Sequence, residues 1–340
     1  MHEHISLSGQ DLSTRRTELS FPNGKQGRQP LSARLIEPSS DFGSHFNRKP
    51  FQFFHGLADH PLFTLPRLLE LARVTRQERP QHLYWNAGDN IRVDQRWNKM
   101  GPKPFLVEDA LERIENSGAW ITIHQAQNDP EYAALFDQCM GEFEKLTGVN
   151  VKKVMKMEDA LIFITSPRRV TTYHIDRECN FLLQIRGTKT IYVFDQNDRD
   201  VLPEAEIERF WAVDTNAALY KPEFQDRAMP FSLAPGNGVH IPVNAPHWVQ
   251  NDDNVSISLS VNFMWKDSER ANIYYANYLM RKLGMNPRPP RRSRISDGAK
   301  NAAMAVTFAP VRSVARSTLR FMRRLKRAGF RREYRVCDYE

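Results

Sequence analysis

A series of short strand-like segments between residues 160 and 265 constrains the fold most. The predicted strands span 160–165, 170–176, 180–186, 189–195, 231–234, 238–242, 247–250 and 255–265. Turn residues separate them, among them Gly187, Pro235-Gly236 and Asn254. Many short strands with such punctuation are typical of a β-sandwich or barrel. Residues 203–225 interrupt the series and are predicted to form a helical or loop insertion.

The last predicted strand has two chemically different faces. One face is small and polar and the other apolar: Ser256, Ser258, Ser260 and Asn262 alternate with Ile257, Leu259, Val261 and Phe263. We expect the apolar face to pack outward against a second layer. The serines either face water or line the interior of a barrel that holds a ligand, and the nearby histidines favour the interior.

Three further regions flank this β-rich part. Residues 1–45 are polar and aperiodic, and we expect a mobile lead-in. Residues 46–158 mix predicted strands at 51–54, 82–85 and 120–124 with helices near 61–72, 107–114 and 130–146, and should brace the core of 159–266. Residues 267–340 are predicted to be helical and basic. The class is therefore mainly β, with an N-terminal α/β extension and C-terminal helices.

Basic charge is concentrated in the C-terminal part. Residues 281–340 contain 17 Lys and Arg and four Asp and Glu, a net charge of +13, so residues 1–280 carry −5 of the total of +8. From Val311 to Leu325 apolar residues recur at helical spacing, with arginines opposite. This pattern predicts a helix that packs on the body or on a second copy as a homodimer, or one that contacts nucleic acid or an anionic membrane surface.

Composition indicates a cytoplasmic setting. The three cysteines match neither a disulfide framework nor a zinc site. The first residues contain no apolar run of a secretory signal, and no stretch approaches the roughly 18 apolar residues of a membrane span.

A metal site is suggested by His174 and Asp176, which are two residues apart in a predicted strand. Alternate side chains of a strand share a face, so the imidazole and carboxylate converge. His247 would complete two histidines and one carboxylate, a set that suits iron(II) and leaves positions open. The H-x-D pair alone is unspecific, because a strand-end histidine bonded to a neighbour gives the same pattern.

A dicarboxylate such as 2-oxoglutarate at that metal would need a buried cation and a hydroxyl for its far carboxylate. Lys189 begins a strand whose alternate residues are apolar, where a lysine usually reaches solvent. Thr171 is three residues from His174, so its hydroxyl reaches the same cavity only across a bend or bulge.

The spacing of these residues resembles a known family. The segment from His174 to Lys189 (HIDRECNFLLQIRGTK), together with Pro246-His247-Trp248-Val249 and Val261-Asn262-Phe263, is similar to the cupin-like JmjC-domain oxygenases, with the pattern of their asparaginyl hydroxylases. The resemblance covers about residues 160–266. It implies a double-stranded β-helix, also called a jelly-roll or cupin core.

The resemblance also implies roles for individual residues. His174, Asp176 and His247 match the iron(II) ligands, Lys189 and Thr171 the partners of the distal carboxylate of 2-oxoglutarate, and Asn180 and Asn262 the asparagines that line the co-substrate pocket. The family's tyrosine contact to 2-oxoglutarate has no aligned counterpart. His240 is expected to be a hydrogen-bonded strand histidine rather than a fourth ligand, and Trp248 a packing residue rather than a substrate platform.

The implied activity is that of an iron(II)- and 2-oxoglutarate-dependent hydroxylase or demethylase that releases succinate and carbon dioxide. Its prime substrate, a protein side chain, a nucleic acid or a small metabolite, stays open. The alternative is a catalytically silent cupin-like binding protein that acts through its basic tail. A zinc or manganese isomerase lacks support, because no further carboxylate stands at ligand spacing near His247.

Overall fold

The structure, a computed structural model, describes residues 34–88, 91–97, 106–266 and 268–306. All of them belong to one structural unit that begins at Arg34. The helix predicted around Val311 to Leu325, and with it most of the basic tail, lies outside the described residues.

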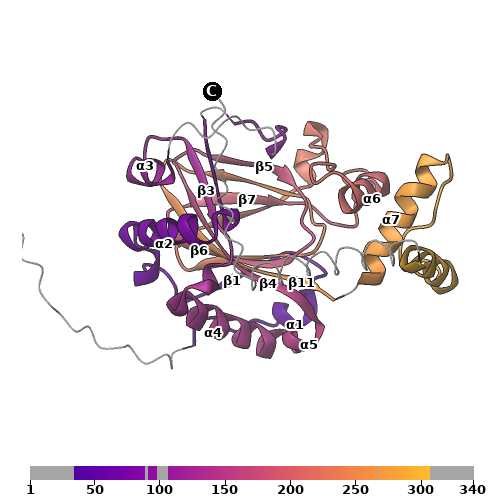
Figure 1. Ribbon diagram of the computed structural model, residues 1–340, viewed down its shortest axis with the longest axis horizontal. Helices are drawn as coiled ribbons and strands as arrows, with labels where there is room; N and C mark the ends of the chain where they lie inside the picture. The colour runs from indigo at the N-terminus through magenta and orange to yellow at the C-terminus, as the bar shows by residue number, and fades with distance from the viewer. Residues whose placement is uncertain (1–33, 89–90, 98–105, 267, 307–340) are drawn as a thin grey trace, which may run out of the picture. The chain divides into compact units, whose positions relative to one another are not determined.

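Two antiparallel sheets form the centre of this unit (Figure 1). Across the seven-stranded sheet the order is β1 (Phe51–Phe54), β9 (Asn237–Ile241), β6 (Cys179–Arg186), β11 (Ser256–Trp265), β4 (Met155–Thr165), β3 (Ala119–Ile123) and β2 (Leu83–Ala87). Across the four-stranded sheet it is β5 (Val170–His174), β10 (His247–Asn251), β7 (Lys189–Val193) and β8 (Met229–Leu233). Apolar side chains of both sheets meet between them, among them Leu182, Ile191 and Val249. The expected double-stranded β-helix is thus confirmed.

Helices surround the sheets. The α-helices are α1 (Asp41–His45), α2 (Leu65–Glu78), α3 (Val107–Glu112), α4 (Pro130–Thr147), α5 (Val151–Val154), α6 (Glu204–Ala212) and α7 (Ser268–Lys282). The 3-10 turns are η1 (Pro61–Phe63), η2 (Pro80–His82), η4 (Ala126–Asn128) and η5 (Pro222–Arg227). A further helix spans 294–306. None of the described helices is long and apolar enough to cross a membrane.

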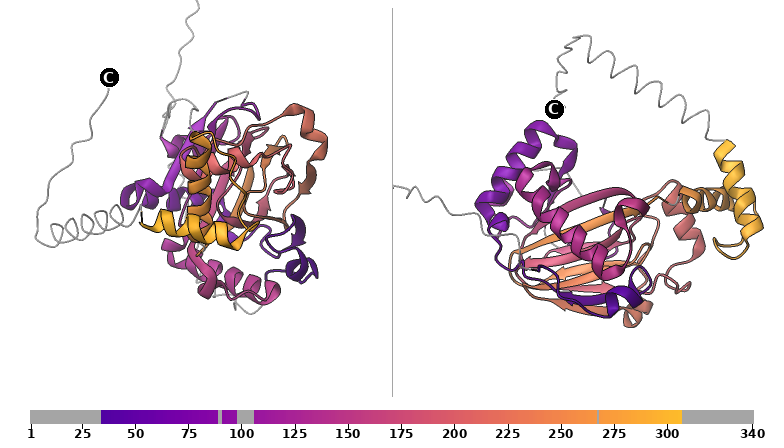
Figure 2. Two further views of the ribbon diagram at one scale, coloured as in Figure 1. Left: turned by 90° about the vertical axis from the view of Figure 1, so that its right-hand side faces the viewer. Right: turned by 90° about the horizontal axis from the view of Figure 1, so that it is seen from below.

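Helix α4 covers the outer face of the seven-stranded sheet (Figure 2). It begins where the Asp129 carboxylate accepts the Glu131 N–H at 3.0 Å, and it ends at Gly148, whose φ of 69° is the left-handed conformation that glycine adopts readily. Its buried stripe contacts the sheet directly, since the ring of Phe143 stacks on Phe181 of β6 at 3.8 Å between centroids. Burying such aromatic rings supplies much of the hydrophobic stabilisation of this layer.

The two faces of β11 differ as the sequence predicts. Leu259 and Phe263 belong to the outer apolar core with α4, whereas Ser258 and Asn262 turn to the inside, and all four are buried. The serines therefore line the barrel interior and do not face water.

The N-terminal boundary differs from the sequence-based expectation. Residues 34–45 are not a mobile lead-in, because Phe42 of α1 is fully buried against Phe51 and Ile36 forms a β-bridge with His55. Within the 46–158 extension, β1, β2 and β3 add directly to the edges of the seven-stranded sheet. The backbone N–H and C=O groups of these strands pair with neighbouring strands of the sheet. The pattern of a short strand does not reveal which strand it will pair with.

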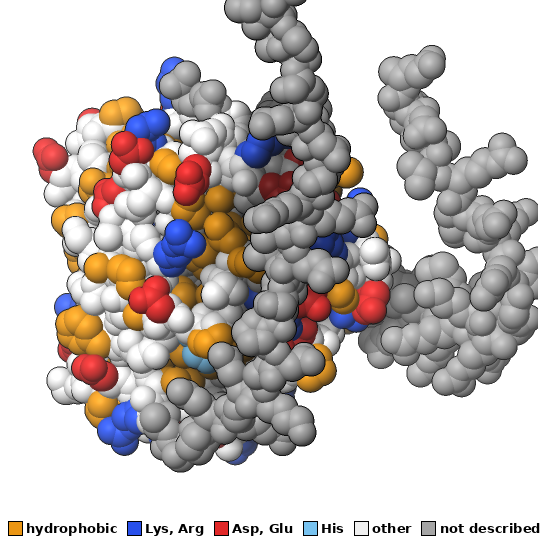
Figure 3. All heavy atoms as spheres, turned by 90° about the vertical axis from the view of Figure 1, so that its left-hand side faces the viewer, with side chains coloured by type: hydrophobic (Ala, Val, Ile, Leu, Met, Phe, Trp, Pro, Cys, Tyr) orange, Lys and Arg blue, Asp and Glu red, His pale blue; other side chains and the backbone are white. Residues whose placement is uncertain are grey.

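Helix α7 packs beside α6, the helix of the predicted 203–225 insertion, at the far side of the unit from α2 and α3 (Figures 1 and 2). On the opposite face, acidic, basic and apolar side chains are interspersed where the described residues are visible (Figure 3). That visible surface carries no large patch of a single charge.

Candidate metal centre and co-substrate site

Three metal-ligating side chains meet where β5 and β10 end. His174 is the last residue of β5, and it pairs across the sheet with His247, the first residue of β10. Ligand atoms of His174, Asp176 and His247 all lie within 4.8 Å of one another. The Asp176 Oδ2 atom is 3.9 Å from His174 Nε2 and 3.6 Å from His247 Nε2. Residues 73 positions apart in sequence therefore present two imidazoles and a carboxylate to one point.

Backbone carbonyls orient both imidazoles. His174 Nδ1 lies 2.7 Å from the carbonyl oxygen of Thr172, and His247 Nδ1 lies 3.0 Å from that of Ala245. Each Nδ1–H donates to a carbonyl, which leaves the Nε2 lone pair facing Asp176. Burial lowers the pKa of His247 to about 4, so this ring is neutral near pH 7 and able to bind a cation.

Asp176 lies beyond the strand that was predicted to contain it. β5 ends at His174, and Asp176 stands in the turn before β6, where its carbonyl oxygen accepts the Asn244 N–H at 3.0 Å. The side chain of Asn244 in turn accepts the indole N–H of Trp211 at 2.8 Å. The backbone of Asp176 is therefore held by the β9–β10 connection and, through Trp211, by α6, and not by the β5 ladder.

Lys189 points into the barrel and not to solvent. Its side chain is only 5% exposed, and its Nζ donates to the hydroxyl of Ser258 at 2.5 Å. Ser258 donates to Gln184 Oε1 at 2.7 Å, and the Gln184 amide is bound by the carbonyls of Arg186 and Gly187. Burial lowers the pKa of Lys189 to about 7. No ion pair with a carboxylate is found for this amine among the described residues, so the barrel contains a buried lysine without a counter-ion.

Thr171 reaches the same interior through a β-bulge. In the β5–β10 ladder His174 pairs with His247 but Thr171 pairs with Val249, so two residues of β5, Thr172 and Tyr173, oppose the single Trp248 of β10. The extra residue returns Thr171 to the inner face, as the odd spacing requires. Its hydroxyl accepts the indole N–H of Trp120 at 3.1 Å.

Asn180 and Asn262 pair across the β6–β11 ladder and are both buried. Asn262 Oδ1 accepts the hydroxyl of Ser260 at 2.7 Å, whereas Asn180 Oδ1 has no hydrogen-bond partner among the described residues. Burial, and then the negative charge of Asp176, raises the pKa of the nearby Glu178 to about 7. This end of the barrel is thus polar and rich in carboxyl groups, as a cation site requires.

His240 and Trp248 have the structural roles that were expected. His240 is fully buried on the outer side, where Nδ1–H donates to the Asn180 carbonyl at 2.9 Å and Nε2 accepts the Asn47 N–H at 2.9 Å. Both ring nitrogens are therefore used. Trp248 stacks on Tyr192 at 4.2 Å on the outside of the four-stranded sheet and donates to Gln225.

Two aromatic residues of the inner surface were missed by sequence reasoning. Trp120 of β3 bonds Thr171, and Tyr84 of β2 packs edge-on against Trp120 at 5.7 Å. Both lie in segments that read only as apolar strands. Their alternation with Ile121 and Trp85, whose side chains pack on the outer core, is the signal that marks them as inward-facing.

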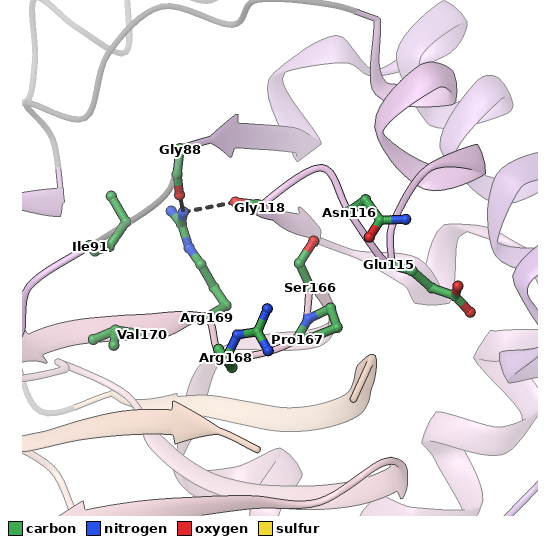
Figure 4. A pocket seen from close by; sticks show the side chains of 10 residues that line it. All are labelled: Gly88, Ile91, Glu115, Asn116, Gly118, Ser166, Pro167, Arg168, Arg169 and Val170. Carbon is green, nitrogen blue, oxygen red and sulfur yellow. Dashed lines mark hydrogen bonds between the residues drawn. The ribbon is translucent and has the colours of Figure 1, made fainter. Parts of the chain in front are cut away.

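A cavity of about 410 Å³ lies near the start of β5 and contains none of the predicted site residues. Figure 4 shows Arg169 at its wall, donating to the carbonyls of Gly88 and Gly118 at 2.6 and 2.8 Å. Arg169 also donates to Asn86 of β2. The buried guanidinium thereby ties the start of β5 to the edge of the seven-stranded sheet, at the opposite end of β5 from His174.

Comparison with solved structures finds many matches, among them several structures of one protein. An X-ray structure of Escherichia coli YcfD is 16% identical with a TM-score of 0.48, covering 80% of this chain and 68% of that one. A structure described as YcfD, a ribosomal oxygenase from Escherichia coli, is 16% identical with a TM-score of 0.44, covering 81% and 67%. The same protein in complex with cobalt and 2-oxoglutarate is 16% identical with a TM-score of 0.40, covering 78% and 64%.

Comparison of the sequence with protein-family models identifies the family. No curated protein matches the sequence. The model of the cupin-like domain family matches residues 72–271, more than half of the chain, and this range contains both sheets except β1 and all seven predicted site residues. The chain therefore belongs to the family of proteins with a cupin-like domain.

Proposed function

We propose that the protein is an iron(II)- and 2-oxoglutarate-dependent oxygenase that hydroxylates a C–H bond of a protein side chain or a small metabolite. The observation that carries the proposal is the pairing of two features in one barrel: a two-histidine, one-carboxylate cluster at one end and a buried, unpaired lysine further inside. Either feature alone fits other functions, but together they match a metal-bound dicarboxylate.

The separation of the two features supports a co-substrate of this size. His247 pairs with Val193 of β7, and Lys189 is four residues further along that strand with its side chain on the same face. The backbone positions are therefore roughly 13 Å apart. A five-carbon diacid, together with the histidine and lysine side chains that hold it, spans such a distance.

The donor set fits iron(II). Two imidazoles and one carboxylate would hold one side of the ion and leave its other coordination positions open. Their Nδ1–H bonds to backbone carbonyls fix the rings before metal binds. Iron(II) held in this way, with 2-oxoglutarate as co-substrate, supplies the activation of oxygen, and the products of the co-substrate are succinate and carbon dioxide.

The remaining residues of the barrel bind and orient the co-substrate. Lys189 offers its charge to the distal carboxylate, with Ser258 and Gln184 holding the amine in place. Thr171 offers a hydroxyl on the same inner surface, and Asn180 and Asn262 line the metal end. The apolar side chains between the sheets exclude water from this space.

The test is an assay of succinate formed from 2-oxoglutarate by the full chain with iron(II) and ascorbate, with iron-free and chelator controls. We expect iron-dependent succinate even without a prime substrate, because these enzymes turn over 2-oxoglutarate uncoupled at a low rate. If iron(II) and 2-oxoglutarate bind but no succinate appears, the catalytically silent cupin-like binding protein is the better description.

We also propose that two copies of the chain pair through the C-terminal helices. Exposed apolar side chains support this, since Leu283 at the end of α7 and Ile295 of the helix 294–306 are 79% and 88% exposed. Water-exposed apolar groups of this size are stabilised when a partner covers them. Light scattering should give the mass of a dimer for the full chain and of a monomer after Leu283→Glu with Ile295→Glu; a monomeric full chain would contradict the proposal.

A further inference from the structure

A second cavity, of about 240 Å³, lies on the outer side of the turn that carries Asp176. Arg177, the next residue along the chain, forms part of its wall, and so does Val243, which precedes Asn244. Four basic side chains and two indoles line it: Lys156, Arg177, Arg270, Arg291, Trp211 and Trp265. No Asp or Glu is among the lining residues.

The charge of this lining is opposite to that of the surrounding chain. Residues 1–280 carry a net charge of −5, yet three of the four cations of the cavity come from this acidic part. They are supplied by separate segments, with Lys156 on β4, Arg177 in the turn after β5 and Arg270 on α7. Bringing like charges together costs free energy unless an anion compensates them.

Arg177 is held in place but not fully bonded. Its Nη2 donates to the carbonyls of Phe210 and Trp211 at 2.9 and 3.1 Å, so the guanidinium is fixed against α6. Its Nε is buried and has no acceptor among the described residues. An N–H in this condition is costly unless a water or an ion accepts its hydrogen bond.

Trp265 provides a second N–H of the same kind. Its Nε1 is buried and has no acceptor within the described part of the chain, although the residue lines the cavity. Two donors without acceptors, from β11 and from the turn after β5, thus belong to the wall of one cationic cavity. Both would be satisfied by an oxyanion with several acceptor oxygens.

We propose that this cavity is a binding site for a phosphate group. Phosphate carries between one and two negative charges near neutral pH and offers more acceptor oxygens than a carboxylate, and arginine matches its geometry with two parallel N–H donors. The carboxylate of Asp297, near Arg291 in the sequence, accepts the backbone N–H of Arg291 and is not among the lining residues. The site requires neither the metal nor 2-oxoglutarate, so it goes beyond the proposed function.

The indoles argue against recognition of a nucleobase. Trp211 already has Arg177 over its ring at 5.5 Å and Tyr274 stacked on it at 5.5 Å. Trp265 packs against Phe46 at 6.0 Å. Base recognition by stacking needs an open aromatic face. The cavity therefore recognises the phosphate itself, either free or as a compact ester.

Hydrogen bonds connect the wall of the cavity to the metal end of the barrel. Trp211, which lines the cavity, donates to Asn244, and the backbone N–H of Asn244 donates to Asp176. A phosphate bound to Arg177 would stiffen both ends of this hydrogen-bonded chain, which starts at the cavity wall and ends at a proposed metal ligand.

Tryptophan fluorescence of the metal-free full chain tests the proposal. Two of the six tryptophans line the cavity and residues 281–340 contain none, so weak binding to the basic tail does not produce the signal. Titration with sodium phosphate at constant ionic strength should give a saturable change that sodium acetate does not give. Phenyl phosphate is the second probe: similar or tighter binding assigns the site to an ester, and binding of inorganic phosphate alone assigns it to the free ion.

Three variants make the test specific. Arg270→Gln and Lys156→Gln should each weaken phosphate binding by about tenfold or more, because each removes a charge-assisted contact. Arg73→Gln, an exposed arginine of α2, should change nothing. Lys156 is exposed on β4, so its replacement leaves the fold intact, as thermal melting should show. No saturable signal, or equal affinity in Lys156→Gln and Arg73→Gln, overturns the proposal, whatever the succinate assay shows.

Discussion

The two faces of β6 and β11 are equally buried but chemically opposite. On the outer face, Phe181 and Leu259 pack into an apolar core with α4. On the inner face, Gln184 and Ser258 hold the amine of Lys189. Ser258 is fully buried and its neighbour Leu259 is 2% exposed, so burial alone does not distinguish them.

The outer face of these strands stabilises the fold, whereas the inner face forms the proposed binding site. Apolar side chains would fill the barrel at less cost than a buried amine, which loses its hydration on folding. The outer face shows that the same strands readily supply such residues. The inner face carries polar groups instead, and a bound diacid with a metal would give the amine of Lys189 and the cluster around Asp176 their partners.

The largest expected effect is on the metal end of the inner face. Asp176→Ala should reduce iron-dependent succinate formation to the background of the iron-free reaction, because the two histidines that remain bind a divalent ion weakly and leave its charge uncompensated. Cobalt(II) binding, followed by visible absorption, should weaken in parallel. Asp253→Ala, which removes only an exposed ion pair with Arg168, is the matched control and should leave both unchanged. Undiminished succinate from the Asp176 variant would refute the assignment.

The outer face should respond in stability and not in ligand binding. Leu259→Ala should lower the free energy of unfolding by about 2–5 kcal/mol, since it opens a cavity in a close-packed core. The affinity for 2-oxoglutarate should stay within about twofold, well under 1 kcal/mol. Urea unfolding and calorimetric titration measure the two quantities. Leu219→Ala, at an exposed position, should affect neither; a Leu259 variant of normal stability but weak co-substrate binding would erase the contrast between the faces.

Much of this contrast was predictable from sequence, because a strand's period of two sorts side chains by face. The alternation from Ser256 to Phe263 assigned both faces of β11 correctly. The odd spacing of Thr171 and His174 required a bulge, and the ladder contains one. Within a strand, the spacing along the sequence determines which face each side chain is on, so these features can be predicted from sequence.

Contacts between distant segments could not be predicted. Nothing around Trp120 indicates that its indole bonds Thr171, and nothing near Trp211 indicates a chain of hydrogen bonds to Asp176. Phe42 lies in a polar segment, and only the assembled core shows that its ring is buried. Such pairings depend on how sheets and helices pack, which a local pattern does not encode.

Removing the inner cation should have a smaller effect than removing a metal ligand. Lys189→Met should weaken 2-oxoglutarate binding by about 2–4 kcal/mol, roughly thirty- to a thousandfold, because the distal carboxylate is left buried without its counter-charge. Stability without co-substrate should not fall, since the variant also removes an amine that is costly to bury. Lys145→Met, at an exposed position of α4, is the control. Unaltered co-substrate affinity would show that Lys189 has another role.

The smallest effect is a pH dependence that only the inner face can produce. Burial lowers the pKa of Lys189 to about 7 in the protein without co-substrate, whereas a bound carboxylate favours the charged amine and raises it. Below pH 7 the amine is already protonated, so 2-oxoglutarate affinity should not depend on this group.

Above pH 7 the amine is mostly neutral and must take up a proton from solution when 2-oxoglutarate binds. The affinity for 2-oxoglutarate should therefore fall by up to about tenfold, or 1.4 kcal/mol, per pH unit. Calorimetric titration between pH 6 and 9, in buffers of different ionisation enthalpy, should show uptake that approaches one proton per 2-oxoglutarate. In Lys189→Met this slope and the proton uptake should vanish, while Leu259→Ala should retain both. A slope that persists in Lys189→Met would assign the titration to another group and remove the pH evidence for a co-substrate on the inner face.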